Sequence, residues 1–205
     1  HHSPIGARRP LSTTNWVRYE GMGMSIEVPS DWENLSGDES YIRYLIANSS
    51  SEASTDVLYA SLSTSLFFME PDTPLWISVT QQSYGSDYPL AMLRMDVVNY
   101  LREQSYGFIE TSVEDLPFGK ALRSHYARQE KGSSRLSEET IEYQFYQDRV
   151  MFDLVIYSER EMKSETVQLF DAVVKTVEVS DPPSIRRALA AAAGDATKGQ
   201  NSATI

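Results

Sequence analysis

The sequence contains no cysteine among its 205 residues. Disulfide bonds, thiolate catalysis and cysteine-based zinc or iron–sulfur sites are therefore excluded together. The compartment stays open, because exported domains without cysteine are common. Histidine is also scarce: there are three, and His1 and His2 resemble the remnant of a purification tag. His125 is thus the one internal histidine available to a metal or catalytic site.

Long apolar runs and a basic charge balance are absent as well. The longest apolar run covers residues 188–193, whereas a membrane-spanning helix needs roughly 20 apolar residues. We therefore expect no membrane span. The 29 acidic residues outnumber the 18 basic ones and give a net charge of -11. This balance disfavours nucleic acid and anionic membranes and favours basic partners, although acidity also simply aids solubility.

Apolar residues that alternate with polar ones predict many short strands. In residues 24–28, for example, Met24, Ile26 and Val28 alternate with Ser25 and Glu27. By the same criterion we predict strands at residues 16–20, 24–28, 41–47, 57–69, 75–82, 108–116, 119–129, 140–147 and 149–158.

Two segments have the helical period instead. Within residues 88–104, apolar residues recur at helical spacing, and Pro89 suits the first turn. The second helix is expected to start after Ser164 as N-cap and to stop before residues 181–184. The two apolar stripes are Leu90, Leu93, Val97 and Leu101, and Val167, Phe170, Val174 and Val177.

The order strands, helix, strands, helix, with short connections, predicts an α+β domain built on an antiparallel sheet. Tyr143 and Phe145 share one face of their strand and Tyr146 lies on the other. Both faces are thus partly apolar, which favours helices on two sides of the sheet. We expect this domain at residues 15–180, a disordered lead-in at residues 1–14, and a flexible tail at residues 181–205 whose start suits a short helix.

Two glycines near the N-terminus, Gly21 and Gly23, suggest at first a nucleotide-binding loop. A dinucleotide fingerprint needs a third glycine, where this chain has Ile26, and a helix after the loop. A strand comes next here instead. Residues 19–28 therefore predict a β-hairpin corner, where glycine supplies positive φ.

The segment WVRYEGMGMSIEVPSDW, residues 16–32, resembles the opening of the PsbP-like superfamily, which includes the extrinsic PsbP protein of photosystem II, Ran-binding import factors of the same fold and related bacterial lipoproteins. The matching residues are Tyr19, Gly21, Gly23, Ile26, Val28, Pro29 and Trp32. The resemblance implies an αβα sandwich around a central antiparallel sheet, covered here by two amphipathic helices. It also implies a non-catalytic accessory or partner-binding role outside the cytoplasm, in an exported lipoprotein-like form or in a thylakoid lumen.

Metal binding and nucleophilic catalysis find little support. His125 lies beside Arg123 and opposite the face of Leu122, Ser124 and Tyr126, so Ser124 and His125 cannot share a proton. We expect His125 to be a surface or hydrogen-bonded strand residue, the alternative being one ligand in a site shared with acidic neighbours. No Gly-x-Ser-x-Gly elbow is present. We expect no cofactor and no metal.

Neighbouring carboxylates at loop-like positions are best explained as solvated charge. These are Glu138 with Glu139, Glu159 with Glu161, and Glu114 with Asp115. A glycosidase pair remains an alternative, because it would be assembled only by the fold.

An apolar stretch around a Pro-rich turn is the predicted docking site. If this hairpin projects from the sheet, its tip can bind a partner; core burial is the rival interpretation. The residues are Phe67, Phe68, Met69, Leu75 and Trp76.

We therefore predict a non-enzymatic accessory or adaptor protein that binds a protein partner, such as a membrane-complex subunit. A small-molecule carrier is the first alternative, and it requires an apolar cavity of several hundred cubic ångströms between sheet and helix. A carboxylate-type hydrolase is the second, and it requires two acidic side chains about 5–10 Å apart in a cleft.

Overall fold

The computed structural model describes residues 15–21, 23–180, 183, 186–187 and 189–191. Two antiparallel sheets contain its strands: a three-stranded sheet of order β1-β2-β10 and a seven-stranded sheet of order β3-β4-β5-β9-β8-β7-β6. The expected lead-in and most of the expected tail lie outside the described residues, and the domain limits stay a prediction. The strands are β1 (Trp16–Gly21), β2 (Met24–Pro29), β3 (Glu33–Asn34), β4 (Leu66–Met69), β5 (Leu75–Ser83), β6 (Phe108–Leu116), β7 (Gly119–Gln129), β8 (Leu136–Gln147), β9 (Val150–Arg160) and β10 (Glu178–Val179).

The hairpin predicted around the two glycines is confirmed. Gly21 of β1 pairs with Met24 of β2, which leaves a two-residue connection that contains Gly23. Gly23 has φ 72°, the left-handed conformation that glycine adopts without steric cost. The chain continues from this connection into strand β2, so the glycines do not lead into a helix N-terminus that could hold a phosphate.

Both predicted helices are present, as α3 (Leu90–Glu103) and α4 (Ser164–Lys175). Pro89 lies at the N-cap of α3. The N-cap of α4 is Lys163, without a side-chain cap, so the prediction of Ser164 is wrong by one residue. Of the stripe predicted for this helix, Phe170 and Val174 are buried in α4, Val167 is part-buried, and Val177 is buried but lies beyond the end of the helix.

Two predicted strands are wrong: α1 (Glu39–Ala47) occupies residues 41–47, and α2 (Thr55–Ser63) occupies the first part of residues 57–69. Asp38 caps α1 by accepting a hydrogen bond from the Tyr41 amide at 2.8 Å, and Ser54 caps α2 through the Val57 amide. Such caps satisfy amide groups that a helix start leaves unpaired. Only the last four residues of the second segment form a strand, β4.

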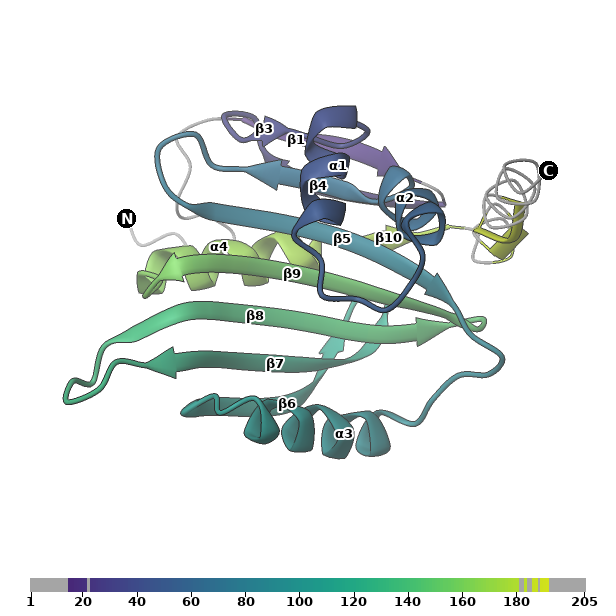
Figure 1. The fold of residues 1–205 in the computed structure, drawn as a ribbon. Helices are drawn as coiled ribbons and strands as arrows, with labels where there is room; N and C mark the ends of the chain where they lie inside the picture. The colour runs from purple at the N-terminus through teal and green to yellow at the C-terminus, as the bar shows by residue number, and fades with distance from the viewer. Residues whose placement is uncertain (1–14, 22, 181–182, 184–185, 188, 192–205) are drawn as a thin grey trace, which may run out of the picture.

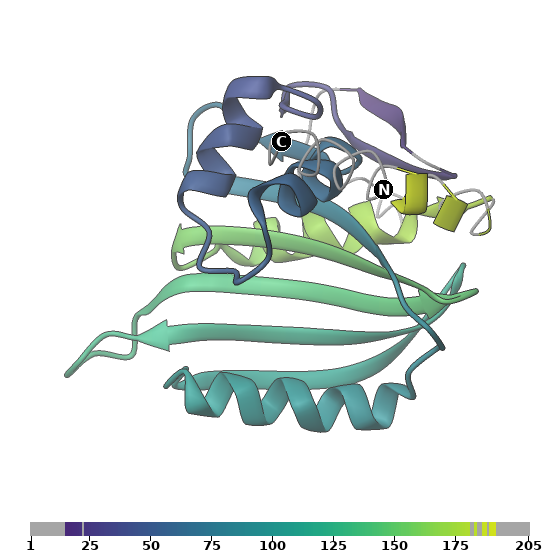
Figure 2. The same cartoon turned by 45° about the vertical axis from the view of Figure 1, so that its right-hand side comes forward.

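The helices cover the two faces of the seven-stranded sheet unequally. Figure 1 shows α4 behind the sheet, with α1, α2 and α3 in front of it. The view turned by 45° gives the same layers (Figure 2). The fold is therefore an αβα sandwich of the α+β class, as predicted, but four helices rather than two cover the sheet in the described residues.

The main core lies between the seven-stranded sheet, α4 and the small sheet. Strand alternation directs Phe152, Leu154 and Ile156 of β9 toward this side, and all three are fully buried. We call this side of the large sheet the α4 face. The opposite side, the α3 face, carries the alternate residues of the same strands, such as Asp153 and Val155.

Candidate functional site

The predicted docking hairpin, β4–β5, is mostly part of the core. Phe67, Phe68 and Leu75 are buried, and Phe67 packs beneath Tyr41 of α1 with 5.4 Å between ring centroids. Core burial, the rival interpretation, therefore describes these three residues. Met69 and Trp76 are part-buried, and a docking role for them stays a prediction.

A different apolar surface is exposed on the outer side of α3. Met92, Met95 and Tyr100 are 50%, 65% and 60% exposed; we call these three residues the α3 patch. A shallow pocket of about 250 Å³ beside Met95 is also lined by Arg94, Val98, Asn99 and Arg102. The apolar stripe predicted for this helix contains none of these three residues, and Leu101 is its buried member.

The α3 patch lies at one edge of the large sheet, because α3 is fixed to the terminal strand β6. Arg94 Nε donates to Thr111 Oγ1 at 2.7 Å, and Arg94 Nη2 donates to the Thr111 carbonyl at 3.0 Å. Val113 of β6, on the same face as Thr111, is 43% exposed. This edge thus presents apolar side chains on a firmly attached helix.

His125 is a hydrogen-bonded strand residue, as expected. Its Nε2 lies 2.6 Å from Glu139 Oε2, and Glu139 Oε1 accepts a hydrogen bond from the Met162 amide at 2.8 Å. Glu139 is buried, so the prediction that it is a solvated loop carboxylate is wrong. Both of its oxygens are used in joining β7, β8 and the segment before α4.

The other predicted carboxylate pairs also lie on strands more than expected. Glu114 and Asp115 belong to β6, Glu138 to β8 and Glu159 to β9. Asp115 and Glu138 are exposed, as solvated charges would be, whereas Glu114 is part-buried. Glu159 and Glu161 are exposed. None of these carboxylates lines the three pockets found among the described residues.

A carboxyl pair that sequence analysis missed lies on the α3 face, at Glu142 of β8 and Asp153 of β9. Burial raises the pKa of Glu142. Burial, together with the charge and the hydrogen bond of Glu142, raises the pKa of Asp153 well above its ordinary value. A protonated Asp153 that donates to Glu142 explains both directions, since two like charges so close in a poorly solvated place are unfavourable.

Polar atoms without partners surround this pair. Ser124 is directly opposite Glu142 in the sheet register, and Gln144 is directly opposite Asp153. Ser124 Oγ, Gln144 Oε1 and Asp153 Oδ1 are buried and have no hydrogen-bond partner in the structure. The two carboxyls bond to each other directly, whereas glycosidase carboxylates stand about 5–10 Å apart. The pair therefore lacks the geometry of the hydrolase alternative.

On the α4 face, a polar network fixes α4 to the sheet. Arg123 Nε donates to Tyr143 Oη at 3.0 Å and to Asp171 Oδ1 at 3.2 Å, and Tyr143 Oη donates to the same carboxylate oxygen at 2.5 Å. Burial opposes the guanidinium charge, but Asp171 and Tyr143 outweigh it and raise the pKa of Arg123. Burial and Asp171 raise the pKa of Tyr143. This network is structural, because every group in it has its partners.

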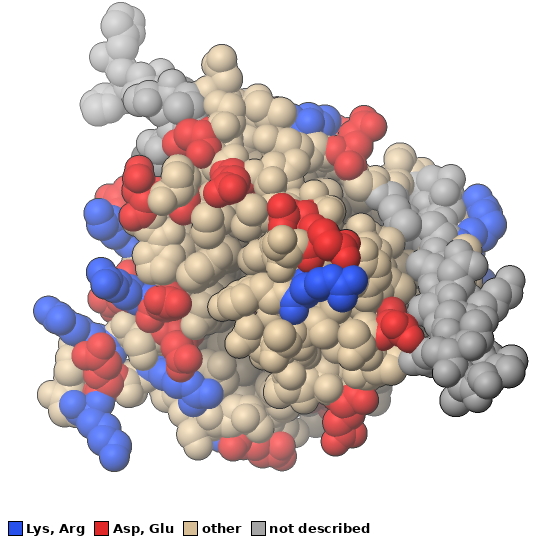
Figure 3. Space-filling model, turned by 45° about the horizontal axis from the view of Figure 1, so that its top comes forward, with Lys and Arg blue, Asp and Glu red and all other residues tan. Residues whose placement is uncertain are grey.

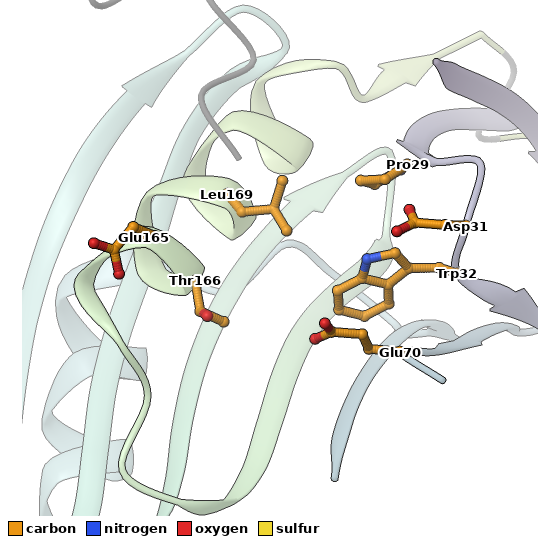
Figure 4. A pocket seen from close by; sticks show the side chains of 7 residues that line it. All are labelled: Pro29, Asp31, Trp32, Glu70, Glu165, Thr166 and Leu169. Carbon is orange, nitrogen blue, oxygen red and sulfur yellow. The ribbon is translucent and has the colours of Figure 1, made fainter. Parts of the chain in front are cut away.

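A small acidic pocket lies where the β2–β3 turn meets α4. Its volume is about 200 Å³, and Figure 4 shows Trp32, Glu70 and Glu165 around it. In the space-filling view, acidic side chains are spread over one face of the molecule with basic ones between them (Figure 3). Attraction of a cation therefore depends on particular places such as this pocket. Within the described residues, no group of three or more His, Cys, Asp or Glu residues is arranged to hold a metal ion.

Comparison with solved structures shows which known fold this chain resembles. The solution structure of cyanobacterial PsbP (CyanoP) from Synechocystis sp. PCC 6803 matches with a TM-score of 0.53 at 13% identity, over 86% of this chain and 99% of that chain. The chain has a PsbP-like fold. A crystal structure from Bacteroides thetaiotaomicron VPI-5482 has a TM-score of 0.47 at 14% identity, over 83% of this chain and 50% of that chain. No protein-family model and no curated protein matches the sequence.

The PsbP-like fold is the fold that the resemblance of residues 16–32 implies. All seven matching residues lie in or beside the β1–β2 hairpin and the turn after it. Ile26, Val28 and Trp32 are buried there. These residues of the motif therefore pack the small sheet against the core. Among the residues that the structure describes, every helix is too short or too polar to cross a membrane.

Proposed function

We propose that this protein is a non-enzymatic accessory protein that binds a protein partner through the α3 patch. The observation that carries the proposal is the exposure of Met92, Met95 and Tyr100 on the outer side of one helix. Methionine, tyrosine and arginine are the residues enriched at protein interfaces, and Arg102 lies beside Met95 in the shallow pocket. An amphipathic helix with such anchors suits an apolar groove on a partner.

The alternatives receive less support from the geometry. A carrier needs a pocket of roughly 300–1,000 Å³, whereas three pockets lined by residues that the structure describes have volumes of only about 200–260 Å³. A carboxylate hydrolase needs two separated acids, whereas Glu142 and Asp153 are hydrogen-bonded to each other. A partner-binding role requires neither arrangement.

A site-specific photo-crosslinker tests the α3 patch directly. We would place it at position 95 in the full chain, express the protein in its native source, and identify the adducts by mass spectrometry. One discrete adduct that disappears when Tyr100→Asp is added supports the proposal. The matched control is position 57 on α2, where Val57 is 46% exposed. Equal labelling from positions 57 and 95, or no adduct at position 95, contradicts it.

We further propose that the protein acts outside the cytoplasm, at a membrane complex. The support is the PsbP-like resemblance of residues 16–32, together with the matching fold. Fractionation of the native source with an antibody against the domain tests this location. Recovery only from the cytoplasm contradicts it.

A further inference from the structure

The middle of the α3 face is not covered by a helix of the described chain. Helix α2 contacts β5, and α3 contacts β6 and β7, whereas β9 and β8 lie between β5 and β7 in the sheet order. Figures 1 and 2 both show α1 and α2 on one side of β8 and β9 and α3 on the other. The side chains of Glu142, Gln144 and Asp153, which belong to this face, are accordingly part-buried rather than buried.

The carboxyl pair of Glu142 and Asp153 has no positively charged partner among the described residues. Neither residue belongs to any of the ion pairs that the described part of the chain forms. Burial and the neighbouring Glu142 raise the pKa of Asp153, and no lysine, arginine or histidine of the described chain opposes this effect. Two carboxyls in a poorly solvated place gain from an added cation, because it removes the repulsion that otherwise keeps one of them protonated.

A buried hydroxyl group is the second, independent sign of a binding site. Ser124 of β7 is fully buried, lies directly opposite Glu142 on the same face, and its Oγ has no hydrogen-bond partner. Gln144 Oε1 and Asp153 Oδ1, which belong to residues opposite each other in β8 and β9, are also buried without a partner. Most buried polar atoms in proteins are hydrogen-bonded, and all three of these oxygens can accept a hydrogen bond. This region therefore lacks donors, and a ligand that fits it must bring several of them.

Aromatic rings border the carboxyl pair on the same face of the sheet. The charges of both carboxyls contribute to raising the pKa of Tyr126, so its ring lies close to them, and Tyr106 contacts Tyr126 with 5.1 Å between ring centroids. Tyr157 follows two strands away in the same row of the register, and its ring centroid is 5.9 Å from that of Trp76. Tyrosine and tryptophan rings attract organic cations, and their surfaces also accommodate an aliphatic chain.

We propose that the middle of the α3 face binds the primary ammonium group of a small aliphatic amine. Glu142 and Asp153 pair with the positive charge, and Gln144 Oε1 accepts one of its hydrogen bonds. Ser124 Oγ, on the other side of Glu142, adds a further acceptor. An ammonium group has three donors and no acceptor, which matches a set of oxygens that lacks donors. The net charge of -11 attracts such a ligand from a distance.

The surroundings favour an organic cation over a metal ion. A calcium ion takes six to eight oxygen ligands, whereas only two carboxyls meet here, and the described residues contain no group of three or more His, Cys, Asp or Glu residues arranged to hold a metal ion. The neighbouring tyrosines suit the aliphatic part of an amine. The site shares no residue with the α3 patch, so it does not depend on the proposed partner binding.

Isothermal titration of the full chain with 1,4-diaminobutane at low salt tests this proposal. We expect saturable binding, and no binding of 1,4-butanediol, which has the same carbon chain without the charges. Glu142→Gln keeps the shape of the side chain and should weaken binding of the diamine by about tenfold or more. Ser124→Ala should weaken it by about twofold to tenfold. This second variant should not lower the melting temperature of the free protein, because the hydroxyl has no partner in the folded chain.

Matched controls separate this site from general acidity and from other cations. Glu110→Gln removes the same charge from an exposed position on β6 and should leave the affinity within about twofold. Calcium chloride and Nα-acetyl-lysine amide are titrated at the same ionic strength, and both should bind more weakly than the diamine.

Four results overturn the proposal. The first is no saturable binding of the diamine, which would mean that the unpartnered oxygens hold water only. The second is equal binding of the diol, and the third is an equal loss of affinity in Glu110→Gln and Glu142→Gln. The fourth is tighter binding of calcium or of the lysine derivative, which would assign the site to a metal ion or to a lysine of a protein.

Discussion

The two faces of the seven-stranded sheet are built from alternate residues of the same strands, yet they differ in chemistry. On the α4 face, β9 presents Phe152, Leu154 and Ile156, all fully buried. On the α3 face, the intervening residues include Asp153 and Val155, which are only part-buried. The first face is a close-packed apolar core, and the second combines polar groups, aromatic rings and incompletely satisfied atoms. Stability is therefore expected to come mainly from the α4 face, and adaptation to function mainly from the α3 face and the surfaces beyond the core.

The largest contrast should come from neighbouring residues of β9. Ile156→Ala removes a fully buried side chain and should lower the free energy of unfolding by about 2–5 kcal/mol. Val155→Ala, on the α3 face, should cost about 1 kcal/mol or less, because its site is already partly open. Urea denaturation of both variants measures the difference. Equal losses would show that both faces are packed alike.

The polar network of the α4 face should give the next effect. Asp171→Ala leaves Arg123 without its carboxylate in a place where the arginine side chain is only 17% exposed. The loss should be about 1–3 kcal/mol, below the value for a fully buried pair because Asp171 itself is partly exposed. Thermal unfolding gives the measurement. The control is Asp115→Ala, which breaks the exposed pair with Lys120 and should change the free energy of unfolding by less than about 0.5 kcal/mol. If Asp115→Ala costs as much as Asp171→Ala, the network of Arg123 does not contribute more to stability than an exposed ion pair.

The carboxyl pair of the α3 face should reveal itself through pH. The pKa of Asp153 is raised in the folded state, so the folded protein binds the proton more tightly than the unfolded chain does. Its contribution to stability is complete below the unfolded pKa and is lost as the pH rises through the folded pKa. Asp153→Asn keeps a donor toward Glu142 and no longer titrates. The variant should therefore be more stable than the wild type at pH 8, by on the order of 1–2 kcal/mol, and nearly equal to it at pH 4.

Urea denaturation at both pH values checks this expectation. Glu110→Gln, which changes an exposed carboxyl on β6, is the matched control and should not reproduce the pH-dependent gain. If Asp153→Asn destabilises the protein as much at pH 8 as at pH 4, the carboxyl is held in its charged form and the description of the pair is wrong.

Most of the helices and strands could be predicted from the sequence, but α1 and α2 could not. Alternation and helical spacing are local signals, and they located β6 to β9, α3, α4 and the hairpin around Gly23. They failed at α1 and α2, where short aliphatic segments with several tyrosines resemble strands. The decisive signals were the caps at Asp38 and Ser54, which satisfy the first amides of each helix.

The candidate sites were harder to predict because they are made by pairing. Glu142 and Asp153 come together only through the register of β8 and β9, in which Asp153 is opposite Gln144. The pocket beside Trp32 needs three segments to meet. Phe67 and Phe68 looked like a docking tip because composition alone does not say whether an apolar hairpin projects from the sheet or crosses it. Met92, Met95 and Tyr100 lie outside the apolar stripe predicted for α3, and this position off the stripe is the signal in the sequence that could have indicated the α3 patch.

Substitution of an exposed residue of the α3 patch should have the smallest effect on stability. Met95→Ser removes a side chain that is 65% exposed, so the free energy of unfolding should change by less than about 0.5 kcal/mol. Leu101→Ser, on the buried stripe of the same helix, should cost several times more because it places a hydroxyl in an apolar contact. Thermal unfolding of the two variants compares the two sides of α3 within one scaffold. A large loss from Met95→Ser would mean that the residue packs within the fold, and the α3 patch would then have no surface to offer a partner.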